Sequence, residues 1–479
     1  MDESLRPYRY RWPRDWLRRS PHWRPLRPTR FLARSMPEPA DELAGDSRWP
    51  AFFPSPISLV TTTDGSRTGL EKVVAATVVN RFPYVLAVSL CRQPLSQRHH
   101  VRREFMNMLE RSGSAAVQFL PPGADLDRVI DVIQSVPDER TDQRVAHCGL
   151  QVRDALTGGA PVFESAYMVY EARLAEPGRD FQGDPIYSTP WIDAGSHRVY
   201  FLEIKAIQLR EDIARGRSQI HWRALPAWAP RLAPQPSLAA EVDRVRTDRY
   251  QKGYTPHYVF PSAGTAAFEA DAIENGMAVK HLPPLPQDQV EVDNDRARWP
   301  CFFPSSAGMI TTWAAPHVPN VMPCGSTMVV SRHPLIVAPC ISYAAINERY
   351  APRGTLDLVR RAGRFGCSVP FAHDCVVNAI TYTGNISIRD DRDKIAHAGL
   401  GVYPADRAPV LSDLPVHFDC EVAREVRLGT HAMFLGQVRR ILVRDDVSPQ
   451  NPLDWCPWAA IRSVKPAEDP APVTPAAAV

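Results

Sequence analysis

The chain has 479 residues, of which 44% are hydrophobic and 23% charged, and its formal net charge is +3 at pH 7. These values are ordinary for a globular protein, and so small a charge argues against nucleic acid or an anionic membrane as the partner of the whole chain. No apolar run approaches the roughly 18 residues of a membrane span, and no apolar stretch of signal-peptide type opens the chain, so we expect a cytoplasmic protein.

Residues 1–47 are rich in Arg and Pro, and Trp12, Trp16 and Trp23 stand among the arginines. Basic and aromatic residues together are typical of single-stranded nucleic-acid or membrane-surface contacts. The segment has no helical periodicity to support such a role. We therefore expect a disordered leader and no binding to nucleic acid or membrane.

Residues 48–212 predict many short strands. The β-branched run 57–63 ends at an Asp-Gly turn, and further strands are expected at 73–79, 84–90, 115–120, 167–174 and 199–209. Helices are expected at 101–111 and at 125–134, where apolar residues have the i, i+3, i+4, i+7 spacing of an amphipathic helix. Short strands with few helices favour a small β-barrel over a βαβ array.

A Pro-rich linker, 213–297, follows. It contains a helical piece at 238–249 and a more apolar second half, which we expect to dock on a barrel surface. Residues 277–282 are expected to supply the first strand of a second barrel. The tail 448–479 is rich in Pro and Ala and is expected to be disordered.

Residues 298–447 again predict short strands with a few helices. The strands are expected at 309–313, 326–331, 335–342, 365–370, 418–426 and 431–443, and the helices at 356–363 and 374–381. This half has the same pattern as 48–212, which indicates a second barrel.

Sequence echoes show that the two halves are tandem copies. The segment 48–55, Arg-Trp-Pro-Ala-Phe-Phe-Pro-Ser, recurs 250 residues later at 298–305, and Ala146-His147-Cys148-Gly149-Leu150 recurs at the same offset as Ala396-His397-Ala398-Gly399-Leu400. Ser196-His197 and Thr430-His431 are 234 residues apart, so the first copy carries an insertion of about sixteen residues, placed at 176–191. We call 48–212 repeat 1 and 298–447 repeat 2.

Several motifs of repeat 2 carry a family resemblance. They are Thr311-Thr312, the run 320–336 (Asn-Val-Met-Pro-Cys-Gly-Ser-Thr-Met-Val-Val-Ser-Arg-His-Pro-Leu-Ile), the run 363–370, Asp393-Lys394 and Gly429-Thr430-His431. In order and spacing this set resembles the flavin reductase-like family, and repeat 1 holds a degraded copy. The resemblance implies a mainly β chain with a few helices, folded as two tandem split β-barrels of FMN-binding type. The pair would form an intramolecular pseudo-dimer, and further dimerisation stays open.

The run 320–331 has residues suited to the edge of a flavin. The flavin ring is flat and largely apolar, and its pyrimidine edge needs hydrogen-bonding groups. Small polar residues let the backbone approach that edge, and the candidates are Asn320, Gly325, Ser326, Thr327 and Ser331. Simple turn chemistry is the alternative explanation.

The resemblance also implies three residues for the flavin phosphate: Arg353, Thr355 and Lys394. Arg offers two parallel donors and Lys a point charge. A solvated basic residue at the start of a helix is the alternative, and it is weaker for Lys394 because Lys is rare in this Arg-rich chain.

Repeat 1 lacks most of these polar groups. Gly69, Ala75 and Ala76 stand where repeat 2 has Asn320, Ser326 and Thr327, and Phe105 replaces Thr355. We therefore expect one flavin per chain, held mainly by repeat 2 and walled by repeat 1. The cofactor is expected to be FMN, with FAD as the alternative.

Histidines and cysteines give weaker signals. His147 and His397, and likewise His197 and His431, recur in both repeats, which favours a structural role; proton handling or substrate contact by His431 is the alternative. The nine Cys residues include no CxxC pair, so we expect neither a disulfide framework nor a metal site.

The resemblance implies an NAD(P)H:flavin reductase, in which hydride passes from NADH or NADPH to flavin N5. Reduced flavin would then serve a partner monooxygenase. Two alternatives stay open: a flavoenzyme that acts directly on a small organic substrate, and a non-catalytic module that binds flavin or haem.

Overall fold

The computed structural model describes residues 31–35, 57–73, 75–80, 83–93, 101–121, 124–211, 272–274, 277–281, 308–343, 353–370, 379–380, 382–384, 386–389, 391–403, 405 and 407–444. The rest of the leader, the helix expected at 238–249, most of the helix expected at 374–381 and the tail lie outside these ranges. Within them, no helix combines the length and apolarity needed to cross a bilayer.

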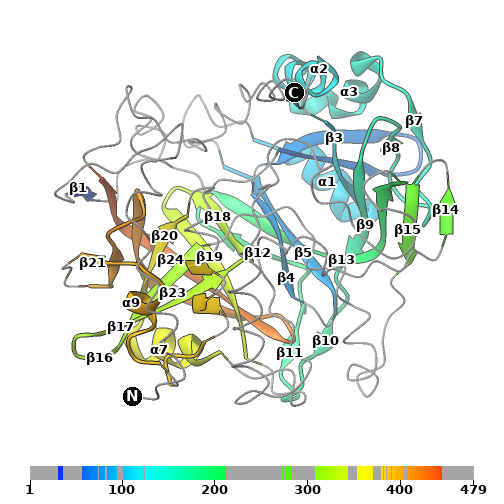
Figure 1. Cartoon of the computed structure of the whole chain (residues 1–479). Coiled ribbons are helices and arrows are strands. Elements are labelled where there is room, and N and C mark those ends of the chain that lie inside the picture. Colours follow the sequence, from blue (N-terminus) through cyan, green and yellow to red (C-terminus); the bar gives the residue numbers. More distant parts are fainter. Residues whose placement is uncertain are drawn as a thin grey trace, which may run out of the picture.

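Repeat 1 forms one large curled sheet and two separate two-stranded sheets, β7–β8 and β10–β11, with helices at the margins of the large sheet (Figure 1). Its strands are β2 (Ser58–Thr63), β3 (Thr68–Val73), β4 (Ala76–Asn80), β5 (Val85–Cys91), β6 (Ser114–Phe119), β7 (Val152–Arg153), β8 (Val162–Phe163), β9 (Met168–Leu174), β10 (Gly178–Arg179), β11 (Pro185–Ile186), β12 (Trp191–Ala194) and β13 (His197–Arg210). Its helices are α1 (Arg103–Ser112), α2 (Ala124–Ser135), the 3-10 helix η4 (Asp138–Arg140) and α3 (Thr141–Cys148).

Repeat 2 forms a second curled sheet. Its strands are β16 (Gly308–Ala315), β17 (Val318–Cys324), β18 (Thr327–Arg332), β19 (Leu335–Ser342), β20 (Arg364–Val369), β21 (Val402–Tyr403), β22 (Val410–Leu411), β23 (Val416–Arg427) and β24 (His431–Arg444). Its helices are α7 (Gly354–Ala362) and α9 (Lys394–His397).

The two sheets have the same strand order. Repeat 1 runs β3-β2-β6-β9-β13-β5-β4, and repeat 2 runs β17-β16-β20-β23-β24-β19-β18, with antiparallel neighbours throughout. A mainly β chain built as two tandem split barrels is therefore confirmed.

The polar run of repeat 2 has more regular structure than the single strand that we expected at 326–331. Residues 320–331 form most of β17, a turn at Gly325 and Ser326, and most of β18. Pro319 and Pro323 are tolerated in β17 because it is the edge strand, where a missing N–H breaks no inner ladder. The run is thus held by a sheet.

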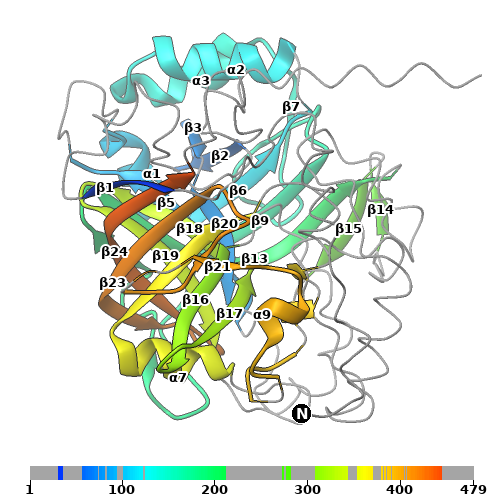
Figure 2. The ribbon, with the colours of Figure 1, turned by 60° about the vertical axis from the view of Figure 1, so that its left-hand side comes forward.

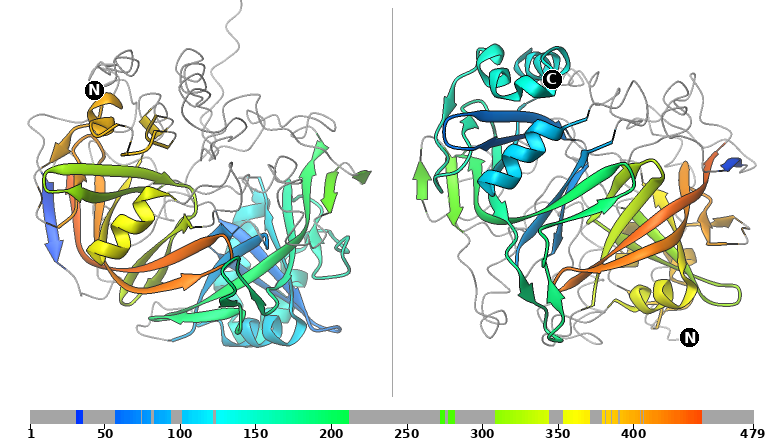
Figure 3. Two further views of the ribbon diagram at one scale, coloured as in Figure 1. Left: turned by 90° about the horizontal axis from the view of Figure 1, so that it is seen from below. Right: turned by 180° about the vertical axis from the view of Figure 1, so that it is seen from behind.

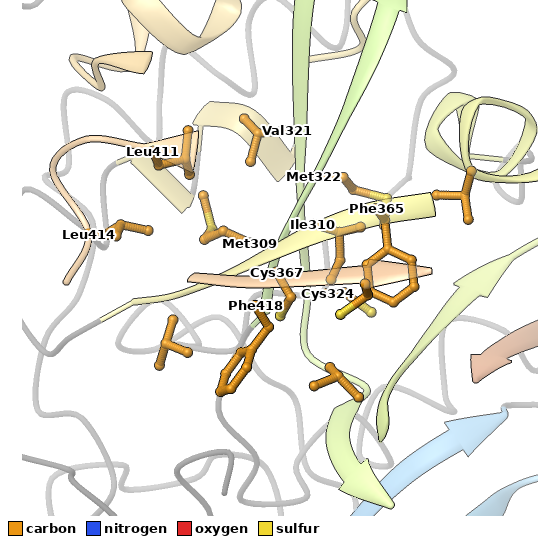
Figure 4. Packing of buried hydrophobic residues seen from close by; sticks show 14 of the residues in the cluster. Met309, Ile310, Val321, Met322, Cys324, Phe365, Cys367, Leu411, Leu414 and Phe418 are labelled. Carbon is orange, nitrogen blue, oxygen red and sulfur yellow. The ribbon is translucent and has the colours of Figure 1, made fainter. Parts of the chain in front are cut away.

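Each barrel has its own apolar core. In repeat 2, Phe365 of β20 and Phe418 of β23 lie with Cys367 and Ile310 in the middle of the barrel (Figure 4). Burial raises the pKa of the Cys367 thiol well above its usual value. This cysteine therefore behaves as a small hydrophobic residue.

The strand that precedes each repeat pairs with the other repeat. β1 (Phe31–Ser35) lies antiparallel to β24 of repeat 2, while β15 (Met277–His281) lies antiparallel to β13 of repeat 1, with β14 (Ala272–Glu274) outside it (Figure 2). The registers match, since Phe31 faces Arg444 as Met277 faces Arg210. Our prediction that 277–282 starts the second barrel was wrong. β5 leaves the edge of β13 uncovered beyond Glu203, and β15 covers it.

The two barrels lie side by side (Figure 3). They pack against each other through a third apolar cluster, to which both repeats contribute. Val85, Ala87 and Phe201 of repeat 1 meet Met328 and Val330 of repeat 2 there. Hydrogen bonds border the cluster: Ser89 Oγ donates to the Val330 oxygen at 2.7 Å. One face of β18, which forms the second half of the polar run, is therefore covered by repeat 1.

The insertion of repeat 1 folds back onto repeat 2 through the hairpin β10–β11. Its buried Asp180 accepts a hydrogen bond from the Tyr343 hydroxyl at 2.7 Å and pairs with Arg427 at 3.0 Å. The Arg427 guanidinium also lies over the Tyr343 ring, 4.8 Å from its centre. The inserted segment is thus fixed beside the end of β19.

Candidate functional site

Asn320 and Thr355 come together beneath the start of α7. Asn320 Nδ2 donates to Thr355 Oγ1 at 2.9 Å, and both side chains are buried. Among the residues that the structure describes, Asn320 Oδ1 has no hydrogen-bond partner. A buried amide oxygen without a donor is costly, so this position suits a further donor group.

The first turns of the two equivalent helices differ in chemistry. In repeat 1, the carboxylate of Asp138 accepts hydrogen bonds from the backbone N–H groups of Glu104 at 2.7 Å and Phe105 at 3.4 Å, at the start of α1. Burial raises the pKa of Asp138, and the bond from Glu104 N opposes that rise. Ile388 stands at the aligned position of repeat 2. A helix start favours negative charge, and α7 has no such carboxylate from its own chain at this aligned position.

Arg353 and Lys394 both donate to backbone oxygens between Thr383 and Ile386, on either side of the undescribed residue 385. Arg353 is the N-cap residue of α7, without a side-chain cap bond, and its guanidinium donates to the Gly384 oxygen at 3.4 Å. Lys394 is buried, and its ammonium group donates to the oxygens of Thr383 at 3.3 Å and Ile386 at 3.0 Å. Both cations therefore shape the wall beside the start of α7. Their contact with a phosphate stays a prediction.

Of the remaining predicted residues, Gly325 and Ser331 bond to repeat 1, whereas Ser326 and Thr327 bond within repeat 2. The Gly325 oxygen accepts from Thr77 Oγ1 at 3.3 Å, and Ser331 Oγ accepts from the backbone N of Ser196 at 3.2 Å. Thr327 Oγ1 donates to the Cys324 oxygen at 2.9 Å. The backbone oxygen of half-buried Ser326 accepts from Cys340 N at 2.8 Å. The eight predicted residues thus do not form one cluster: four lie around the start of α7, two bond to repeat 1, and two bond within the β17–β19 region of repeat 2.

Repeat 1 has filled the space that corresponds to the first group. A Cβ at Gly69, the counterpart of Asn320, would lie 3.1 Å from the ring of Phe105. The fully buried Glu71 next to it pairs with Arg144 at 2.7 Å and with Arg102 at 2.8 Å. Apolar contact and an internal ion cluster therefore replace the polar pair of repeat 2.

The recurring histidines make local contacts. His431 Nδ1 lies 2.8 Å from Thr430 Oγ1, and His197 Nδ1 lies 2.8 Å from Ser196 Oγ. This shared contact favours the structural interpretation, and a proton-handling role for His431 stays a prediction. Sequence reasoning missed Asp391, whose buried carboxylate lies 2.7 Å from His397 Nδ1. Its only signal was the Asp-rich run just before Lys394.

No group of three or more His, Cys, Asp and Glu side chains in the described ranges has an arrangement that could hold a metal ion. The polar residues under α7 are amide, hydroxyl and cationic groups, which suit an organic anion better than a metal.

A family model described as the flavin reductase like domain matches this chain twice, at residues 50–224 and 301–459, which together make up more than half of it. The two matches agree with the tandem repeat. A search of curated proteins found no match.

Solved structures similar to this chain include flavoredoxin of Desulfovibrio vulgaris (Miyazaki F), with 20% identity, 31% of this chain and 76% of that chain covered, and a TM-score of 0.26. Nitrilotriacetate monooxygenase component B from Bacillus cereus has 19% identity, 36% and 87% coverage, and a TM-score of 0.30. The flavin reductase HpaC complexed with NADP+ has 17% identity, 34% and 83% coverage, and a TM-score of 0.25. Scores this low carry no argument about function, so the family assignment depends on the two matched regions.

Proposed function

Because the chain belongs to the flavin reductase-like family, we propose that it is a flavin-dependent oxidoreductase whose repeat 2 holds a single flavin. The flavin, once bound, would supply the redox chemistry by accepting hydride from NADH or NADPH. The protein's own residues bind and orient the ring and keep water away from it.

The observation that carries the proposal is the difference between the two helix starts. In repeat 1, Asp138 provides a negative charge at the start of α1. In repeat 2, the aligned residue is Ile388, and Thr355 takes the place of Phe105. A phosphate at the start of α7 would restore the missing anion. The unpartnered Asn320 Oδ1 next to Thr355 fits a donor from the same ligand.

The contact between the repeats supports a working pseudo-dimer. Gly325 and Ser331 are held by Thr77 and Ser196 of repeat 1, so the backbone of the polar run is fixed from outside its own barrel. Rigid positioning of this kind is what a binding site requires. We propose that repeat 1 has given up its own site and kept the supporting role.

The absorption spectrum of the purified chain tests the proposal. We expect a flavin spectrum, as isolated or after addition of FMN, that bleaches when NADH or NADPH is added without oxygen. Titration with FMN should reach one equivalent per chain. A chain that refuses both FMN and FAD would overturn the proposal, and two equivalent tight sites would overturn the single-site version.

An exchange of residues between the repeats locates the site. Asn320→Gly with Thr355→Phe imports the Gly69 and Phe105 contact that repeat 1 already packs, so the barrel should fold. We expect this double variant to lose flavin binding. The reverse exchange, Gly69→Asn with Phe105→Thr, should leave FMN binding by repeat 2 unchanged. Equal flavin binding by the first variant and the wild type would place the site elsewhere.

A second candidate function is a flavoenzyme that keeps its flavin and acts on a small substrate in place. The hairpin β10–β11 favours it, since Asp180 ties the insertion to Tyr343 and Arg427 of repeat 2. If a monooxygenase kept apart from this protein cannot use the reduced flavin, the protein retains its flavin, which would support the second function. Efficient use of the flavin by that enzyme would support the reductase.

A further inference from the structure

An open groove of about 830 Å³ runs along α7. Gly354, Asp357, Leu358 and Arg361 line it, and their spacing of i, i+3, i+4 and i+7 places them on one face of the helix. The lined face is therefore roughly 10 Å long, at 1.5 Å per residue. One end of the groove reaches the start of α7, where we place the flavin phosphate.

The walls of the groove combine cationic and small apolar groups. Among the described lining residues, four are arginines and one is an aspartate: Arg360, Arg361, Arg389, Arg392 and Asp357. Arg360 is bound to Glu425, and Arg389 lies 3.7 Å from Asp357, so the groove keeps an excess of positive charge. The opposite wall is Ala314, Ala315 and Val318, at the tip of the β16–β17 hairpin.

Repeat 1 carries the opposite charge at three of the four positions that align with the groove arginines. Glu110, Glu139 and Asp142 stand 250 residues before Arg360, Arg389 and Arg392, and Glu104 stands before Gly354. An Arg-rich coding bias would add arginine to both repeats, yet three of the four groove arginines appear in repeat 2 alone; the fourth, Arg361, aligns with Arg111 of repeat 1. The positive charge occurs in repeat 2, the repeat that has Asn320 and Thr355. This indicates that the positively charged groove binds part of the ligand held by repeat 2.

We propose that the groove along α7 binds the adenylate half of a dinucleotide, and that this dinucleotide is FAD. The inference rests on the proposed function, because the flavin half must begin at the start of α7. Arg361 and Arg392 would bind the second phosphate, and the face formed by Ala314, Ala315 and Val318 would lie against the adenine. A nucleoside monophosphate has about the length of the lined helix face.

Binding of FMN and FAD to the full chain, followed by quenching of flavin fluorescence, tests the proposal. We expect FAD to bind about tenfold more tightly than FMN. Arg361→Glu with Arg392→Asp should remove this preference. We expect the affinity for FAD to fall about tenfold and the affinity for FMN to fall less than threefold. Arg128→Asp, an exposed substitution on α2 of repeat 1, is the charge control and should change neither affinity.

A second probe separates the two sources of an adenylate. If FAD binds no more tightly than FMN, 2′,5′-ADP is titrated into the FMN-loaded chain. Binding that the double substitution weakens would assign the groove to the nucleotide end of NADPH, supporting the adenylate site and overturning FAD as its source. If neither FAD nor 2′,5′-ADP distinguishes the double variant from the wild type, the inference is overturned. Failure of FMN and FAD alike to bind would instead overturn the proposed function.

Discussion

The side-chain oxygen of Asn80 in repeat 1 accepts hydrogen bonds from the backbone N and the hydroxyl of Thr430 in repeat 2, both at 2.8 Å. The reciprocal contact joins Ser331 of repeat 2 to the backbone N of Ser196 in repeat 1 at 3.2 Å. Asn80 aligns with Ser331, and Thr430 with Ser196. The same contact between the repeats is thus made twice, as in an isologous dimer interface. The acceptor is the carboxamide of Asn80 in one copy of the contact and the hydroxyl of Ser331 in the other.

This relationship predicts unequal losses on truncation. Asn80→Ala leaves the N–H and hydroxyl of Thr430 and the N–H of His431 without their acceptor in a mostly buried contact. We expect the free energy of unfolding to fall by about 2–4 kcal/mol. Ser331→Ala removes a smaller group and should cost about 1 kcal/mol. Urea denaturation at pH 7 measures both, and equal losses would contradict the prediction.

The ion cluster in repeat 1 predicts a variant that loses much stability but still binds flavin. Glu71 is fully buried between Arg144 and Arg102, so Glu71→Gln leaves two guanidinium groups without their counter-charge. We expect a loss of about 3–5 kcal/mol in the free energy of unfolding. FMN affinity of the folded variant should stay unchanged, since the cluster lies in repeat 1. Glu139→Gln, at an exposed position, is the control, and a similar small effect in both variants would refute the role of the cluster.

The carboxylate at the start of α1 predicts rescue by an anion. Asp138→Ala removes the acceptor of the Glu104 and Phe105 N–H groups and should cost about 1–2 kcal/mol. Phosphate can bind at the vacated helix start. Phosphate should therefore raise the melting temperature of Asp138→Ala by more than it raises that of the wild type or of Glu139→Ala. Identical phosphate dependence in all three proteins would rule out an anion position there.

Most barrel strands were predicted well because each is a local pattern, although β3 and β17 were not predicted. The β-branched run that forms β2 and the apolar runs of β5, β19 and β24 all appear where expected. β17 was missed because Pro319 and Pro323 are typical of loops, and only its edge position makes them harmless. The partner of β15 was predicted wrongly because pairing across some seventy residues depends on which sheet edge is uncovered, and no local pattern contains that information.

The sequence predicted which residues make up the candidate site better than it predicted the contacts that they make. Asn320 and Thr355 were both chosen from the motif, and the fold places them 2.9 Å apart. Lys394 was expected to be a cation near a ligand, but burial turns its ammonium group toward backbone oxygens. Asp138 was missed, since its role depends on η4 reaching the start of α1. The alignment of Asp138 with Ile388 was the signal that could have revealed it.

A last prediction concerns His417 in the core of repeat 2. Its Nδ1 lies 2.8 Å from Ser368 Oγ, and burial, together with the charge of Arg440, lowers its pKa from 6.5 to about 3. The native imidazole therefore stays neutral while the unfolded chain takes up a proton below pH 6.5. The stability that depends on the neutral form is fully present above pH 6.5 and is lost progressively as the pH falls toward 3. At pH 5 the loss is about 2 kcal/mol.

Repeat 1 supplies the variant that removes this dependence. Gln118 and Val169 form the strand pair that aligns with Ser368 and His417, and Gln118 Nε2 donates to Thr61 Oγ1 at 3.1 Å. Ser368→Gln with His417→Val should import this neutral arrangement. Between pH 7 and pH 5, urea denaturation should show the double variant gaining about 2 kcal/mol relative to the wild type. Parallel pH profiles for the two proteins would mean that the imidazole is not held neutral by the fold.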